Sequence, residues 1–278
     1  MLKYVHMKFK VLMSVAFALL LSLTIIVYDA THGALTRLKI NRLTLESDQI
    51  PEAFDELSLV YFSDLHFYTL GKTYYEDVIQ RINSLNPDFV VFGGDLIDET
   101  QYETYSETER TNIINLLKSI KAPYGKFALL SDTDLEHQTE LLSLYLQSGF
   151  EVINNKLIPI HMLGSASINF LGWDETSDVS ILTQLVADEY TLAFGYDPDL
   201  SASLNENEID VMFAGKTHGG QVTLPIIGPL FMKSETFHKG LYPLSNLNLY
   251  VSSGLGVSNI KARWLTDPSL FLITFKSK

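Results

Sequence analysis

Apolar and polar residues follow two different periods along the chain after residue 35. Residues 35–45 alternate between the two kinds, which predicts a half-buried strand. The continuous apolar run 57–62 predicts a fully buried strand, and 89–92 predicts another. Between them, 74–85 has apolar residues at helical spacing and is stopped by Pro87. A strand, a helix and a strand in this order predict a βαβ unit with parallel strands.

The same periods continue to the end of the chain. We expect helices over 108–120, 140–148 and 179–189. We expect further strands over 125–130, 152–160, 168–172, 191–194, 210–214, 249–251, 262–265 and 270–275. The pattern contains no internal repeat and no second domain boundary, so residues 36–278 are predicted to form one α/β domain.

The N-terminal region has a different pattern. Residues 11–28 are uncharged and strongly apolar over about 18 positions, just enough to span a bilayer as a helix. Lys3, Lys8 and Lys10 precede this run, so the positive-inside tendency predicts a cytoplasmic segment over 1–10. We therefore expect a single-pass anchor in the cell membrane, a linker over 29–35 and an extracytoplasmic domain. A cleaved signal peptide is the alternative, although no Ala-x-Ala site follows the run.

Composition narrows the classes of function. The chain has 278 residues, 46% of them hydrophobic, and its net charge is −13 with no basic run in the body. This charge argues against nucleic acid as the main partner. The absence of cysteine excludes disulfides, thiolate zinc sites and thiol nucleophiles.

Candidate chemistry lies where two of the predicted strands end. Asp64 and His66 follow the strand 57–62, and side chains two positions apart on extended chain point to the same side. Asp95 follows the strand 89–92, and parallel strands open on the same edge of a sheet. Carboxylates and imidazoles that converge there suit a divalent metal. A polar turn after a strand is the simpler alternative for Asp64 and His66 taken alone.

Four motifs in order carry a family resemblance. They are Asp64-x-His66, then Gly94-Asp95-x-x-Asp98, a strand ending near residue 131, and Thr217-His218-Gly219-Gly220-Gln221. In this order, over about residues 36–276, the chain resembles the calcineurin-like metallophosphoesterases, and most of all their membrane-associated bacterial branch. The resemblance implies a sandwich of two packed mixed β-sheets flanked by helices, here preceded by the transmembrane helix.

The resemblance also implies which residues hold metal. The ligands of one metal match Asp64, His66, Asp95 and His218, all of the expected types. One divalent ion, Mn, Fe or Zn, is therefore expected. The second metal of the family shares Asp95, but its other ligand positions are occupied by Asp132, Tyr196 and Lys216, and the catalytic histidine is replaced by Thr133.

These replacements have physical consequences. A protonated lysine has no lone pair, so Lys216 cannot ligate a metal, and Asp132 can pair with its ammonium group. We expect that ammonium to take the space of the second metal and partly neutralise Asp95, so that the site holds at most one metal. Thr133 cannot transfer a proton as a histidine does. The amides of Gly219 and Gly220 are weak candidates for binding a phosphate.

Three functions remain open from the sequence. The first is hydrolysis of a phosphoric ester at this reduced site, with a phosphate-containing small molecule or lipid as substrate, and a membrane or cell-envelope phosphate favoured by the anchor. The second is a degenerate member of the family that binds a phosphate ligand or a partner without cutting. The third is a metal-free, membrane-anchored scaffold, against which the four retained metal-type residues count.

Overall fold

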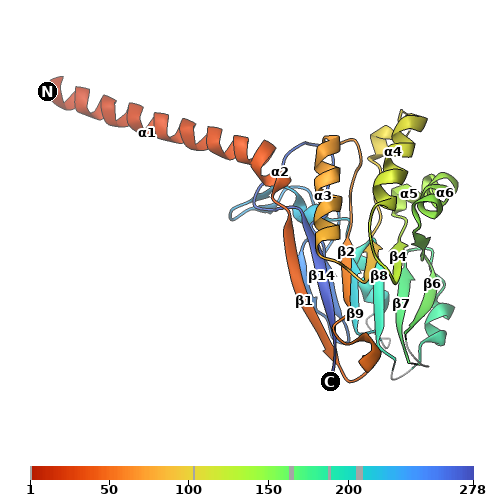
Figure 1. Cartoon of the computed structure of the whole chain (residues 1–278). Helices are drawn as coiled ribbons and strands as arrows, with labels where there is room; N and C mark the ends of the chain where they lie inside the picture. The colour runs from red at the N-terminus through yellow and green to blue at the C-terminus, as the bar shows by residue number, and fades with distance from the viewer. Residues whose placement is uncertain (1, 103, 163–165, 187–188, 205–208) are drawn as a thin grey trace.

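The computed structural model describes the whole chain except residues 1, 103, 163–165, 187–188 and 205–208. The body is built on two six-stranded sheets (Figure 1). The first has the order β1 (Lys39–Ser47), β14 (Ser269–Ser277), β2 (Ser58–Phe62), β3 (Phe89–Phe92), β4 (Gly125–Ala128) and β5 (Glu151–Val152). The second has the order β12 (Gly240–Pro243), β13 (Asn248–Val251), β9 (Val211–Ala214), β8 (Thr191–Gly195), β7 (Ser167–Trp173) and β6 (Lys156–His161).

Both sheets are mixed. The strands β2, β3, β4 and β5 run parallel, whereas β14 pairs antiparallel with β2. In the second sheet β6 and β12 are the antiparallel edge strands. A short hairpin of β10 (Thr223–Leu224) and β11 (Gly228–Pro229) stands apart from both sheets. The predicted sandwich of two mixed sheets flanked by helices is confirmed.

Seven α-helices are described. They are α1 (Leu2–Tyr28), α2 (Ala34–Thr36), α3 (Lys72–Ser84), α4 (Glu107–Lys118), α5 (Asp132–Glu136), α6 (Gln138–Ser148) and α7 (Ser201–Leu204). A π-helical turn, Asp29–Gly33, joins α1 to α2, and short 3₁₀ turns lie at Glu52–Phe54, Glu99–Gln101, Val179–Gln184, Pro198–Leu200 and His218–Gly220. Helix α1 projects away from the body, while α3, α4 and α6 lie against the first sheet (Figure 1).

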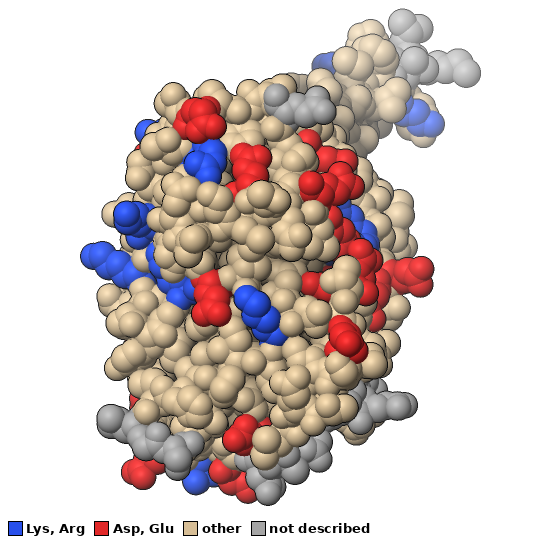
Figure 2. All heavy atoms as spheres, turned by 90° about the vertical axis from the view of Figure 1, so that its right-hand side faces the viewer, with Lys and Arg blue, Asp and Glu red and all other residues tan. Residues whose placement is uncertain are grey.

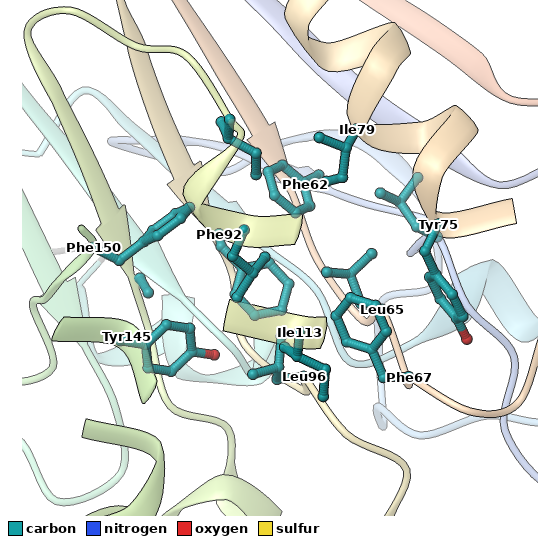
Figure 3. Packing of buried hydrophobic residues seen from close by; sticks show 14 of the residues in the cluster. Phe62, Leu65, Phe67, Tyr75, Ile79, Phe92, Leu96, Ile113, Tyr145 and Phe150 are labelled. Atoms are coloured by element: carbon teal, nitrogen blue, oxygen red, sulfur yellow. The ribbon is translucent and has the colours of Figure 1, made fainter. Parts of the chain in front are cut away.

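The central strands explain why the sheets stack. Alternate residues of β2 and β3 point to opposite faces, and both faces are apolar. Phe62 and Phe92 pack under α3, α4 and α6 (Figure 3). Tyr61 and Phe89 face the second sheet, where the ring of Tyr61 contacts Phe194 and that of Phe89 contacts Phe170. Burial on both faces fixes β2 and β3 in the middle of the molecule, and so fixes the loops that follow them.

On the side opposite α1, basic side chains gather toward one edge of the surface and acidic ones toward the other (Figure 2).

Several boundaries differ from the sequence prediction. The first strand begins at Lys39 rather than at residue 35, because Ala34 and Leu35 belong to a buried helical turn. The predicted strand 152–160 is two strands, β5 and β6, which belong to different sheets. Residues 262–265 are not a strand and make only an isolated bridge, between Trp264 and Val222. The predicted helix 179–189 is a 3₁₀ turn that ends at Gln184, and residues 187–188 lie outside the described part.

Candidate metal centre

The loops after β2 and β3 are joined by their backbones. The amide of Asp64 donates to the carbonyl of Gly94 over 2.9 Å, and the amide of His66 donates to the carbonyl of Asp95 over 3.2 Å. Asp64, His66 and Asp95 all have positive φ, at 54°, 43° and 63°. Such backbone is uncommon for residues other than glycine, and three such residues on two adjoining loops are typical of a functional site. The two loops therefore hold these three side chains in fixed positions.

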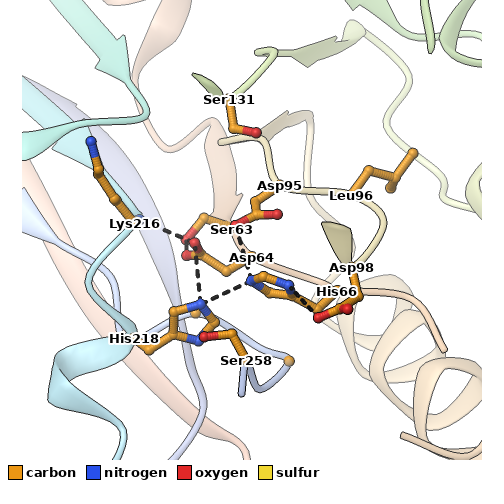
Figure 4. A network of polar contacts seen from close by, with 12 residues as sticks. Ser63, Asp64, His66, Asp95, Leu96, Asp98, Ser131, Lys216, His218 and Ser258 are labelled. Atoms are coloured by element: carbon orange, nitrogen blue, oxygen red, sulfur yellow. Dashed lines mark hydrogen bonds and ion pairs between the residues drawn. The ribbon is translucent and has the colours of Figure 1, made fainter. Parts of the chain in front are cut away.

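His218 comes from the loop after β9 in the second sheet and completes a buried group with Asp64, His66 and Asp95 (Figure 4). One ligand atom from each residue lies within 4.8 Å of all the others. His66 Nε2 is 2.9 Å from both Asp95 Oδ2 and His218 Nε2, and His218 Nε2 is 3.8 Å from Asp64 Oδ1. The structure thus brings together the four residues that the motifs pointed to.

The electrostatics of this group favour a cation. Burial, with the charge of Asp95 beside it, raises the pKa of Asp64 to about 6. Burial also opposes charge on His66, but the adjacent Asp95 outweighs it and raises the pKa of His66 to about 9. Burial and the proximity of His66 lower the pKa of His218, so its imidazole is neutral and has a lone pair available.

The donor set fits one divalent ion. Two carboxylates and two imidazoles are ligands that Mn, Fe and Zn accept, and atoms bound to one such ion lie roughly 3–4 Å apart when bonds are about 2.1 Å. Asp98 Oδ2 lies 3.5 Å from His66 Nδ1, which leaves Nε2 facing the group. Asp98 therefore orients a candidate ligand, and it is not one of the clustered residues itself.

Asp134 holds the backbone of Asp95 by a hydrogen bond, and none of the sequence motifs points to it. Its buried carboxylate accepts hydrogen bonds from the Asp95 amide at 2.8 Å, the Ser131 amide at 3.0 Å and the Tyr102 hydroxyl at 2.6 Å. Ser131 and Asp134 also form a capping box at the start of α5. The pattern Ser131-x-x-Asp134 is readable in the sequence, but its contact with Asp95 spans 39 residues.

The replaced positions form a second, separate network. Lys216 Nζ lies 2.9 Å from Asp132 Oδ2 and 2.5 Å from Asp197 Oδ2. Burial opposes the charge of Lys216, but the two carboxylates outweigh it and raise the pKa of the lysine. The predicted pairing with Asp132 is present, and Asp197 is a second partner that no sequence motif indicates.

The predicted neutralisation of Asp95 by Lys216 is not what the structure shows, because the carboxylates that Lys216 contacts are those of Asp132 and Asp197. Asp95 Oδ2 instead accepts a hydrogen bond from the Tyr196 hydroxyl at 2.7 Å. Burial, and the nearby charge of Asp95, raise the pKa of Tyr196 far above its usual value, so the phenol remains a donor. Burial alone would raise the pKa of Asp95. The interaction with His66, and to a smaller extent the charge of Lys233, outweighs burial and lowers this pKa.

A pocket of about 450 Å³ opens beside the metal candidates. Its lining includes His66, Asp95, Asp98 and Thr133, and also Lys233 and Lys261. The two lysines were not singled out from the sequence, because they follow no motif and lie in loops far along the chain.

Gly219 and Gly220 allow a left-handed backbone conformation and close packing after His218. Both have positive φ, and a Cβ on Gly220 would lie 2.1 Å from Pro229 Cβ. The amide of Gly219 donates to Thr217 Oγ1, and that of Gly220 to the Thr217 carbonyl. Because both amides are bonded within the turn, the phosphate role predicted for this pair has no support in the structure.

Comparison with known proteins finds relatives that are named metallophosphoesterases. No family model matches the chain. An uncharacterized metallophosphoesterase of Bacillus subtilis, YkuE, is 28% identical over 246 residues, which cover 84% of each chain. A transmembrane protein with a metallophosphoesterase domain from Danio rerio is 24% identical, over 93% of this chain and 62% of that protein. The crystal structure of phosphopantetheinyl hydrolase from Mycobacterium tuberculosis has a TM-score of 0.44 at 12% identity, over 77% of this chain and 98% of that one.

The resemblance read from the motifs is thus confirmed, because the curated relatives that match most of the chain are named metallophosphoesterases. Among the described residues, one stretch, His6–Thr36, is helical, long and apolar enough to cross a membrane, and its most apolar window is not buried against the domain.

Proposed function

We propose that the protein hydrolyses phosphoric esters with a single divalent cation. The observation that carries this proposal is the buried Asp64, His66, Asp95 and His218 group beside the 450 Å³ pocket. A cation bound there would lower the pKa of a water molecule and attract phosphoryl oxygens. The relatives named metallophosphoesterases support the reaction class.

The other pocket residues have complementary roles. Lys233 and Lys261 bring positive charge to the cavity that would receive a phosphate. Thr133 can donate a hydrogen bond to a phosphoryl oxygen, but its hydroxyl does not give up a proton near neutral pH. Loss of a general acid slows such reactions about a hundred-fold or more, so we expect a slow enzyme or one with a reactive leaving group.

The altered half of the site supports the proposed stoichiometry. Lys216 is held between Asp132 and Asp197, and it offers a charge in place of a lone pair. Tyr196 donates a hydrogen bond to Asp95, the residue that the two metals of the family would share, and a phenol that acts as a donor is not available as a metal ligand. Both replacements disfavour a second metal.

Binding without hydrolysis is the second candidate function. The ion-paired Lys216 and the neutral Thr133 favour it, because neither position performs the chemistry that the family assigns there. A metal-free scaffold is disfavoured, because Asp64 and Asp95 then lie buried side by side and their repulsion contributes to the raised pKa of Asp64.

The membrane is part of the proposal. Helix α1 would anchor the protein in the cell membrane, with the lysines of its N-terminal part on the cytoplasmic side and the domain outside. The short connection from α1 to β1 keeps the domain near the bilayer surface. A phospholipid or cell-envelope phosphate is therefore the substrate class that we favour.

The test is an assay of the full chain in detergent micelles with Mn²⁺, on a panel of phosphomonoesters and phosphodiesters. Hydrolysis by the wild type that is lost in Asp95→Asn would support the proposed enzyme. The decisive comparison is a variant with Asp132→Asn, Thr133→His, Tyr196→His and Lys216→His. Hydrolysis by this restored variant alone would identify the natural protein as a binding member of the family.

A further inference from the structure

An apolar rim surrounds the hairpin β10–β11. At its tip Ile226 is fully exposed and Ile227 is 74% exposed. We use the term apolar rim for six exposed residues of the hairpin and of two neighbouring loops: Ile226, Ile227, Leu230, Met232, Ile260 and Leu265. Apolar side chains gathered in this way on a surface mark a site of contact with another molecule or a membrane.

Hydrogen bonds join this rim to the base of α1. The hairpin residue Thr223 donates its amide to the carbonyl of Trp264 over 2.9 Å. Arg263, which precedes Trp264 in the chain, donates its amide to the carbonyl of Ala30 over 2.8 Å. Ala30 belongs to the turn that follows α1. The side chain of Arg37 bonds both Asp29 and Asp267 at 3.0 Å. In Figure 1 the light-blue hairpin projects from the side of the body from which α1 leaves.

The same segment reaches the candidate metal centre. The buried guanidinium of Arg263 donates to the carbonyl of His218 at 3.4 Å and to that of Gly256 at 2.6 Å. Residues 257–261, which end beside it, line the pocket. One loop therefore carries rim residues, wall residues of the pocket and a bond to the base of the anchor.

The charge of this region differs from that of the whole chain. Apart from the buried Arg263, residues 221–265 contain the basic residues Lys233, Lys239 and Lys261 against the single acidic residue Glu235, although the chain carries a net charge of −13. Exposed apolar residues flanked by basic ones favour the interface of a bilayer that contains anionic lipids.

We propose that the apolar rim inserts into the interface of the bilayer that α1 spans, so that the pocket opens at the level of the lipid head groups. The proposal rests on the membrane anchoring of α1, and it does not depend on whether the protein hydrolyses its ligand. The adjacent anchor is the reason to choose a bilayer as the occupant of this surface, because it holds the rim against a membrane continuously.

The absence of cysteine makes the test direct, because one introduced cysteine gives one labelled site. Full chains carrying Ile227→Cys, Val179→Cys or Phe17→Cys are labelled with an environment-sensitive fluorophore. They are then reconstituted into vesicles of phosphatidylcholine and phosphatidylglycerol that contain spin-labelled lipid as a quencher. Val179 is the matched control, since it is 66% exposed on the turn Val179–Gln184, and Phe17 reports on the anchor.

We expect the label at Ile227 to be quenched at least about two-fold more than the label at Val179, and to emit at shorter wavelength. Quenching at Ile227 no greater than at Val179, with Phe17 quenched, would overturn the rim contact and leave the anchor standing. Failure to quench at Phe17 as well would overturn the anchor and the rim contact together. A phosphatase assay on the same vesicles separates either failure from a failure of the proposed hydrolysis.

Discussion

Replacing Lys216 by Met tests whether the ammonium group holds the altered half of the site together. Methionine keeps most of the aliphatic length of the side chain and removes the charge. Asp132 and Asp197 would then lose the cation that lies 2.9 Å from one carboxylate and 2.5 Å from the other. We expect the protein to lose stability, because two neighbouring carboxylates are left without a counter-charge.

The exposure of the three side chains sets the magnitude. The side chains of Lys216 and Asp197 are 20% and 21% exposed, and that of Asp132 is 45% exposed. Fully exposed ion pairs contribute about 0–1 kcal/mol, whereas removing one partner of a buried pair costs about 3–5 kcal/mol. Lys216 lies between these limits, so we expect Lys216→Met to lower the free energy of unfolding by about 2 kcal/mol.

The assay is denaturant unfolding of the full chain in detergent, followed by circular dichroism. Lys72→Met is the matched control, since Lys72 and Glu76 form an exposed pair at 3.5 Å, and its effect should stay below about 0.5 kcal/mol. Adding Asp197→Asn to Lys216→Met should restore about 1 kcal/mol, because one uncompensated charge is removed. A Lys216→Met variant as stable as the Lys72→Met control would refute the reasoning.

Three further predictions follow from the site. Tyr102→Phe removes a hydrogen bond to the buried Asp134 and should cost about 1–2 kcal/mol in thermal unfolding while weakening Mn²⁺ binding. Arg263→Met leaves buried carbonyls without a donor and should cost about 3 kcal/mol or more, again by unfolding. The pKa of His66 is raised to about 9 without metal, so this group contributes stability below pH 6.5 that is lost as pH rises through 9. Mn²⁺ affinity, measured by calorimetry, should rise over the same window, and an affinity independent of pH would contradict the assignment of His66.

The sequence predicted those parts of the molecule that depend on short-range pattern. The continuous apolar runs before Ser63 and Gly93 define β2 and β3, and the polar residues after them therefore had to meet at one sheet edge. The pairing of Lys216 with Asp132 also follows from their opposite charges once the family motifs align them.

What the sequence did not predict depends on contacts between distant segments. Asp134 reaches Asp95 only because a short helix follows β4, and Asp197 reaches Lys216 across two neighbouring strand ends. Residues 262–265 look like a strand by composition, but Arg263 bonds loop carbonyls and the base of α1. The position of the apolar rim beside the anchor follows from these same bonds, which no local pattern encodes.

Counting the metal ions that the purified chain binds tests the central claim most directly. Calorimetric titration of the full chain with Mn²⁺ or Zn²⁺, supported by elemental analysis, should give one equivalent at saturation, and Asp95→Asn should reduce it to none. Two equivalents in the wild type would contradict the account of Lys216 and Tyr196, and no binding at all would contradict the assignment of Asp64, His66, Asp95 and His218.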